Sequence, residues 1–249
     1  MRLLVTGGSG YLGAGILRRA PKGWQIAATY LAHPIAQANV AAFRVDVRDA
    51  DALKRAVDEF RPDVIIHAAA HSSGDAMMAV NWDGTRNVAR AAAHIQARLI
   101  HLSSDVIFDG EHAPHDETAA PAPTTPYAES KARAEYAVRE ECPHALIVRT
   151  SLIYGFDPPD PRTRQILNGD MPHLFTDEYR CPIFVDDLAD ALLELASAAS
   201  SLDAEHRGTA APQPLRVRRQ TCTRASRCTA LFACMGGILS CAASARLHA

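Results

Sequence analysis

Lysine and long apolar runs are the two features that this sequence has little of. Only three lysines, Lys22, Lys54 and Lys131, stand among its 26 basic residues. The opening stretch "MRLLVTGGSG" reaches its glycines too soon to contain the apolar core of a signal peptide. The most apolar part of the tail, residues 229–245, falls short of the ~20 apolar residues that a membrane span needs. We therefore expect a cytoplasmic protein without a membrane partner.

The overall composition is that of a folded protein. Of its 249 residues, 48% are hydrophobic and 22% are charged, so disorder is not expected for the chain as a whole. A formal net charge of −2 gives no reason to expect a nucleic acid as partner. The length suits one large domain, or one domain with a small appendage.

The last part of the chain, residues 206–249, differs from the rest in composition. It contains seven arginines but no lysine, aspartate or glutamate, and it holds four of the six cysteines. These cysteines (Cys222, Cys228, Cys234 and Cys241) lack the closely spaced pairs of a zinc site, so we predict no metal site. We interpret this Arg- and Cys-rich tail as the product of a shifted reading frame near residue 205, or as a disordered end.

Short apolar runs alternate with helix-like segments along the first 150 residues. We predict strands at residues 2–6, 25–29, 41–46, 63–70, 97–104 and 145–151. Helical patterns cover residues 49–60, where Asp49 is a candidate N-cap, and residues 124–141. Strands and helices that alternate at this spacing predict an α/β fold with a doubly wound parallel sheet of Rossmann type.

A glycine-rich turn follows the first predicted strand. The stretch "TGGSGYLG" satisfies Gly-x-Gly-x-x-Gly through Gly8, Gly10 and Gly13, and Gly-x-x-Gly-x-x-Gly through Gly7, Gly10 and Gly13. Such glycines allow a tight turn and the close approach of a pyrophosphate to the start of the next helix. A glycine turn can also occur without a ligand, but the strand before it and the helix after it favour a dinucleotide-binding site.

The second strand indicates which dinucleotide is used. An acidic residue at its end would bind the ribose 2′-hydroxyl of NAD, but this strand ends in Thr29 and Tyr30. Arg18 and Arg19 follow the glycine turn and could face a 2′-phosphate, although arginines on an exposed helix face are usually only solvated. NADP(H) is therefore favoured and NAD(H) remains open. Asp46, after the third strand, could accept a hydrogen bond from the adenine amino group or could cap a helix.

Tyr127 and Lys131 form a candidate proton-transfer pair. Residues four apart share one face of a helix, so the phenol and the ammonium group can converge. A nearby cation lowers the pKa of a phenol, which would make Tyr127 an acid–base group. Ser104 ends the fifth predicted strand, at the edge where ligands of doubly wound sheets bind, and could orient a carbonyl oxygen. Ser103 is the competing candidate for that role.

These motifs resemble those of the extended short-chain dehydrogenase/reductase family. The matching stretches, in the family's order, are "TGGSGYLG", "DVRD", "HAAA", "VNWDGTRNV", "LSSDVIFDG", "YAESK", "RTSLIYG" and "CPIFVDDLADALLELA". Within the family, "SSDVIFDG" followed by "YAESK" is most similar to the dTDP-4-dehydrorhamnose reductases. The resemblance covers residues 1 to about 197 and departs from the rhamnose enzymes in the loop after the fourth strand and at Leu152, where they tend to have tryptophan.

The resemblance implies a role for each matching residue. It implies Ser104, Tyr127 and Lys131 as the catalytic residues, and Ser104, Asp105, Tyr127 and Leu152 at the substrate. The implied cofactor contacts are Gly7, Gly10, Tyr11, Leu12, Gly13, Asp46, Val47, Ala68, Ala69, Ala70, Tyr127 and Lys131.

The resemblance also implies a domain division. Residues 1–150 would form an NAD(P)-binding Rossmann domain, and residues 151–205 a small, incomplete C-terminal substrate lobe. The expected activity is NAD(P)H-dependent reduction of a keto group on a nucleotide-linked sugar. A homodimer is the candidate assembly. The alternatives are an epimerase or dehydratase of the same family, and a non-catalytic dinucleotide-binding regulatory subunit.

Overall fold

The computed structural model describes residues 1–111, 115–116, 118–170, 180–206 and 238–240. Its centre is a seven-stranded sheet in the order β3-β2-β1-β4-β5-β6-β9, in which every described pairing is parallel. The strands are β1 (Arg2–Thr6), β2 (Gln25–Tyr30), β3 (Val40–Arg44), β4 (Val64–His67), β5 (Arg98–Ser104), β6 (Leu146–Thr150) and β9 (Ile238–Ser240). The sheet order doubles back at β1 and β4, which confirms the predicted doubly wound fold.

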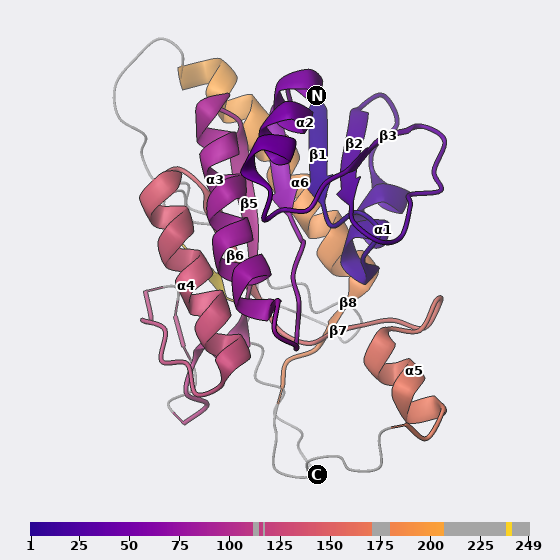
Figure 1. Ribbon diagram of the computed structural model, residues 1–249, viewed down its shortest axis with the longest axis vertical. Helices are drawn as coiled ribbons and strands as arrows, with labels where there is room; N and C mark the ends of the chain where they lie inside the picture. Colours follow the sequence, from indigo (N-terminus) through magenta and orange to yellow (C-terminus); the bar gives the residue numbers. More distant parts are fainter. Residues whose placement is uncertain (112–114, 117, 171–179, 207–237, 241–249) are drawn as a thin grey trace, which may run out of the picture.

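Helices cover both faces of this sheet (Figure 1). The helical segments are α1 (Tyr11–Arg19), α2 (Ala50–Phe60), the π-helical η1 (Ala79–Gly84), α3 (Thr85–His94), the 3-10 turn η2 (Asp105–Ile107), α4 (Pro126–Glu141), α5 (Pro161–Leu167) and α6 (Val185–His206). α2, α3 and α4 pack on one face, and α1 and α6 pack on the other. Because both faces are buried, the central strands are apolar almost without interruption, which is why their sequence pattern predicts them well.

The two hydrophobic cores use alternate residues of the same strands. Ile65 and Leu99 belong to the core beneath α2, α3 and α4, whereas their neighbours Ile66 and Ile100 belong to the core beneath α1 and α6. All four side chains are fully buried. Burial of such a side chain stabilises a fold by about 1.5–3 kcal/mol, so these strands fix the sheet that presents the site.

Side-chain caps start the helices that were predicted most clearly. The Asp49 carboxylate accepts a hydrogen bond from the Ala52 N–H at 2.9 Å, which confirms Asp49 as the N-cap of α2. The Thr125 hydroxyl caps α4 by accepting from the Ala128 N–H at 3.2 Å. Pro126 takes the first position of α4, where its missing N–H is not needed.

Residues 151–205 divide between two places. β7 (Ile153–Tyr154) and β8 (Ile183–Phe184) form a separate two-stranded parallel sheet, with α5 between them in the sequence. α6 returns to the main sheet, where Leu188 and Leu192 pack in the core with residues of α1. Within the predicted substrate lobe, the described elements that lie outside the main sheet are therefore β7, β8 and α5.

Most of the Arg- and Cys-rich tail lies outside the described residues, and with it the four tail cysteines. The described part is β9, which pairs in parallel with β6. Over the described ranges, none of the helices combines the length and the apolar character that crossing a membrane would take.

Candidate active site

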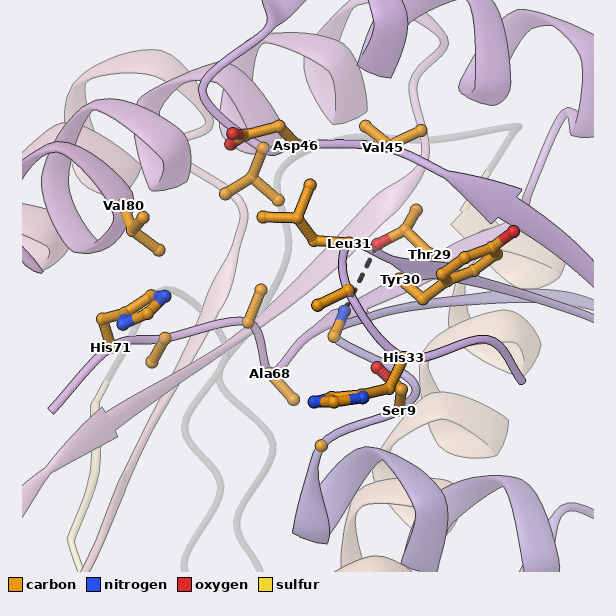
Figure 2. Close-up of a pocket in the computed structure, with 16 residues that line it drawn as sticks. Ser9, Thr29, Tyr30, Leu31, His33, Val45, Asp46, Ala68, His71 and Val80 are labelled. Atoms are coloured by element: carbon orange, nitrogen blue, oxygen red, sulfur yellow. Dashed lines mark hydrogen bonds between the residues drawn. The ribbon is translucent and has the colours of Figure 1, made fainter. Parts of the chain in front are cut away.

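A cavity of about 290 Å³ lies at the carboxyl ends of β1, β2, β3 and β4 (Figure 2). In doubly wound sheets this edge, where the strand order reverses, is the usual ligand site. The cavity is lined by Gly7, Ser9, Gly10, Thr29, Tyr30, Leu31, Ala32, His33, Val45, Asp46, Val47, Ala68, Ala69, Ala70, His71 and Val80.

The glycine turn between β1 and α1 is packed too tightly for side chains. A Cβ on Gly13 would come within 2.2 Å of the Gly7 carbonyl oxygen, and a Cβ on Gly7 would lie 2.8 Å from the Ala69 Cα. Gly7 also has a positive φ of 71°, a conformation that favours glycine. Gly10 is the N-cap of α1 and offers no side-chain cap, so the first N–H groups of α1 remain available to an anion such as a pyrophosphate.

The third strand supplies the carboxylate of this cavity. Asp46 accepts hydrogen bonds from Nε of Arg48 at 3.0 Å to each of its oxygens, and these bonds hold the pKa of the Asp46 carboxyl below its usual range. Among the described residues that line the cavity, Asp46 is the only acidic one. At the end of β2, the Thr29 hydroxyl accepts a hydrogen bond from the Gly7 N–H at 3.3 Å.

Seven of the twelve predicted cofactor contacts line the cavity, whereas three in the first turn of α1 (Tyr11, Leu12 and Gly13) and two on α4 (Tyr127 and Lys131) do not. Gly7, Gly10, Asp46, Val47, Ala68, Ala69 and Ala70 are lining residues. Leu12 is buried in the core and Gly13 packs on the glycine turn. Tyr11 donates a hydrogen bond to the Pro158 carbonyl at 3.1 Å and so links α1 to the segment before α5.

The arginines that follow the glycine turn do not face the cavity. Arg18 lies 3.6 Å from the Asp186 carboxylate, and Arg19 is paired with Asp190, so both are bound to α6. The suggestion that they face a 2′-phosphate is therefore not supported, because acidic residues of α6, 168 or more positions away in sequence, bind both side chains. Sequence reasoning also missed Ser9, His33 and His71, whose signal was their place beside predicted strand ends.

The predicted catalytic residues come from β5 and α4. Ser104 is the last residue of β5 and Tyr127 stands in the first turn of α4. One turn further along α4, the Lys131 ammonium donates to the Leu102 carbonyl of β5 at 2.6 Å. Burial lowers the pKa of Lys131 to about 8, although the Glu135 carboxylate acts in the opposite direction. Ser103, the competing serine, has a buried hydroxyl on which the described residues place no hydrogen-bond partner.

The prediction that Lys131 lowers the pKa of Tyr127 is not borne out. Burial raises the pKa of the Tyr127 phenol, the Asp105 carboxylate raises it further, and the Arg180 guanidinium lowers it. The physical reason is that Tyr127 is largely removed from water, whereas the Lys131 ammonium is directed to the Leu102 carbonyl. A phenol with a raised pKa remains protonated at neutral pH and can serve as an acid.

The two other predicted substrate residues lie at neighbouring strand ends. Asp105 begins η2 directly after Ser104 and is ion-paired with Arg180, which sequence reasoning did not select. Leu152 follows β6, and its carbonyl accepts a hydrogen bond from the Ile183 N–H of β8 at 2.9 Å. Leu152 therefore joins the main sheet to the small second sheet.

Two buried histidines lie on the α3–α4 side of the sheet behind this site. His67 on β4 is hydrogen-bonded to Thr6 at 2.6 Å and to Thr85 at 2.9 Å, and its ring centroid is 5.3 Å from that of His101 on β5. Burial, and then the nearby Lys131 ammonium, lower the pKa of His67 to about 3 and that of His101 well below its usual value. Both histidines are therefore neutral in the folded protein.

The fold and the site together define a Rossmann-type α/β protein with a glycine turn at one strand end and a Ser/Tyr/Lys set at another. Residues 1–209 match the family model described as the RmlD substrate binding domain. The chain belongs to that family.

The relatives of the chain include enzymes and a subunit. It is 33% identical over 214 residues to dTDP-4-dehydrorhamnose reductase of Mycobacterium tuberculosis, which covers 79% of this chain and 66% of that protein. Over 162 residues it is 32% identical to methionine adenosyltransferase 2 subunit beta of Mus musculus, covering 62% of this chain and 47% of that protein. The chain thus spans slightly less than two thirds of the curated reductase.

A solved structure has the same architecture. The dTDP-4-dehydrorhamnose reductase of Bacillus anthracis, in complex with NADP, superposes with a TM-score of 0.63 at 26% identity, covering 79% of this chain and 70% of that chain.

Proposed function

We propose that the protein is an NAD(P)H-dependent reductase of a keto group on a nucleotide-linked sugar, similar to the dTDP-4-dehydrorhamnose reductases. The observation that carries the proposal is the convergence of β5 and α4, where the Lys131 ammonium reaches the Leu102 carbonyl two residues before Ser104. This contact holds the helix that bears Tyr127 against the strand that bears Ser104. The family match over residues 1–209 supports the same reading.

In this proposal each residue has one role. Tyr127, kept protonated by burial, gives its proton to the oxygen of the reduced carbonyl. Ser104 donates a hydrogen bond to the same oxygen and orients it, while Lys131 supplies a buried positive charge behind Tyr127. Asp105 and Leu152 border the substrate.

The cavity beside the glycine turn fits a dinucleotide. Its glycines leave no room for side chains, the helix start behind it is uncapped, and Asp46 lies where an adenine could bind. When bound there, the reduced cofactor would supply a hydride. NADP(H) is favoured, since Thr29 and Tyr30 provide no carboxylate at the end of β2 and a relative was solved with NADP. NAD(H) remains the alternative, and we assign the protein to the cytoplasm with a homodimer as its candidate assembly.

The test is an assay of NADPH consumption with dTDP-4-keto-6-deoxy sugars. Wild-type protein should oxidise NADPH only when the sugar is present. Tyr127→Phe should lower the rate at saturating NADPH by about 10²–10⁴-fold, the usual contribution of a positioned acid. Equal rates for the two proteins would remove Tyr127 from the mechanism.

The similarity to methionine adenosyltransferase 2 subunit beta favours a second candidate, a non-catalytic dinucleotide-binding subunit. That candidate predicts NADPH binding by fluorescence without turnover of any keto sugar, and co-purification with a partner enzyme. An intact Ser/Tyr/Lys set supports the reductase over the subunit.

A further inference from the structure

Asp105 and Arg180 form a two-pronged ion pair beside the candidate catalytic residues. Nη2 of Arg180 donates to Oδ1 of Asp105 at 2.7 Å, and Nε of Arg180 donates to Oδ2 at 3.1 Å. The Arg180 side chain is 22% exposed and the Asp105 side chain 29%, so both are only partly accessible to water. Arg180 stands shortly before β8 of the small second sheet, whereas Asp105 begins η2 directly after β5 of the main sheet. The pair therefore connects the two sheets at the site.

The ion pair extends to the hydroxyl of Ser104. Oγ of Ser104 donates to Oδ1 of Asp105 at 3.3 Å, and this is the same oxygen that Arg180 binds. The Val106 N–H in turn donates to Oγ of Ser104 at 3.5 Å. The orientation of the Ser104 hydroxyl thus depends on a carboxylate whose position is set by Arg180.

The same pair governs the charge around Tyr127. The Asp105 carboxylate disfavours the Tyr127 phenolate and the Arg180 guanidinium favours it, each shifting the pKa of Tyr127 in its own direction. On the helix of Tyr127 itself, the Lys131 ammonium is directed to the Leu102 carbonyl. The described charged groups that act on Tyr127 from other segments are Asp105 on η2 and Arg180 before β8.

We propose that Arg180 is a positioning residue, which holds the Asp105 carboxylate so that the Ser104 hydroxyl is oriented and the negative charge beside Tyr127 is balanced. This role rests on the proposed function, in which Ser104 and Tyr127 act on the carbonyl oxygen. In the structure the Ser104 proton is directed to Oδ1 of Asp105; loss of Arg180 would remove the cation that shares this carboxylate, so Asp105 would hold the Ser104 proton more strongly in competition with the substrate oxygen.

The direct test is titration of Tyr127 in the protein without cofactor or substrate. Protein labelled with ¹³C at the tyrosine ring is followed by NMR from about pH 9 to above about pH 11, because unperturbed phenols ionise at about pH 10 and burial raises the pKa of Tyr127. The signal of Tyr127 is assigned by its loss in Tyr127→Phe. The variants are Arg180→Gln, Arg180→Lys and Asp105→Asn, with Arg164→Gln as a matched control for loss of an arginine from the α5 region.

The two halves of the pair should move Tyr127 in opposite directions. Arg180→Gln should shift its titration to higher pH, and Asp105→Asn should shift it to lower pH. Arg180→Lys, which keeps the charge, should lie near the wild type, and Arg164→Gln should match it. Unchanged titration in both Arg180→Gln and Asp105→Asn, or shifts of the same sign, would overturn the proposal.

A kinetic experiment tests the link to Ser104. Arg180→Gln should lower kcat in the NADPH assay, and Arg180→Lys should recover much of that loss. In a Ser104→Ala background, Arg180→Gln should lower kcat by a much smaller factor. An equal loss in both backgrounds would mean that Arg180 does not act through Ser104. If the wild type turns over no keto sugar, the proposed function fails, but the NMR titration still decides whether Arg180 sets the charge at Tyr127.

Discussion

Helix α4 borders two groups of polar side chains that differ in how far water reaches them. Beneath its middle, Glu135 and Arg149 form an ion pair in which both side chains are 1% exposed, with N–O distances of 2.9 and 2.8 Å. Near its start, Asp105 and Arg180 form a similar two-pronged pair that is 22–29% exposed.

The surroundings of the two pairs explain their different roles. Arg149 also donates to the Ala119 carbonyl at 2.9 Å and lies over the Phe108 ring, so protein groups satisfy most of its donors. This pair ties α4 to β6 and has no access to a ligand. In the Asp105–Arg180 pair, Oδ1 of Asp105 also accepts from the Ser104 hydroxyl, so a bound substrate could compete for that hydroxyl. The same kind of ion pair therefore stabilises the fold in one place and lies beside the candidate site in the other.

The largest effect is expected at the buried pair. Glu135→Leu leaves the Arg149 charge buried without its partner and should lower the free energy of unfolding by about 3–5 kcal/mol. Urea denaturation measures it. The double variant Glu135→Leu, Arg149→Met should recover much of the loss, because no uncompensated charge then remains. A cost below about 1 kcal/mol for Glu135→Leu would mean that the pair does not anchor α4.

A smaller effect should appear on acidification. The pKa of folded His67 is about 3, below the ~6.5 of an unfolded histidine, so only the unfolded chain binds this proton between those values. The free energy of unfolding should therefore fall as pH drops below 6.5, by about 2 kcal/mol at pH 5 for one such histidine. Buried His101 acts in the same direction.

The pH effect is measured by urea denaturation at a series of pH values. His67→Gln keeps a hydrogen-bonding side chain but does not titrate, so its stability should fall less steeply between pH 6.5 and pH 5 than that of the wild type. His144→Gln, which changes an exposed histidine, is the control for loss of a histidine. Equal slopes for wild type and His67→Gln would contradict a neutral buried His67.

The smallest effect on stability is expected at the site pair. Asp105→Asn removes a partly exposed ion pair and should change the free energy of unfolding by about 1 kcal/mol or less. The same variant should nevertheless alter turnover, because it changes the neighbours of Ser104 and Tyr127. A loss of stability as large as that of Glu135→Leu would contradict the claim that the Asp105–Arg180 pair contributes less to the fold than the Glu135–Arg149 pair.

The central strands of the sheet were predictable because they are buried on both faces, whereas β9 lies in the Arg- and Cys-rich tail and was not predicted. Val64, Ile65 and Ile66 of β4 are apolar and buried, so the strand character of this run does not depend on knowing its neighbours. Ser104 was selected because ligands of doubly wound sheets bind at the carboxyl ends of the strands, and Tyr127 because it lies four residues before Lys131 on one face of a helix. What could not be predicted were contacts between distant segments, such as Arg180 with Asp105 across 75 positions.

The direction of the Tyr127 pKa was missed for the same reason. Helical spacing places Lys131 near Tyr127, but it does not say where the ammonium group is directed or how deeply the phenol is buried. The structure directs Lys131 to Leu102 and brings Asp105 and Arg180 close to Tyr127. Long-range packing therefore decides the acid–base properties of the site.

The most direct test of the reductase proposal follows the transferred hydride. A dTDP-4-keto-6-deoxy sugar is incubated with the protein and with NADPH that carries deuterium at the transferred position. The mass of the product is then measured by mass spectrometry. We predict one NADPH consumed for each sugar reduced and one deuterium retained in the product. A changed sugar without net NADPH consumption would indicate an epimerase or dehydratase, and bound NADPH without any product would indicate a non-catalytic subunit; either result would contradict the proposed reduction.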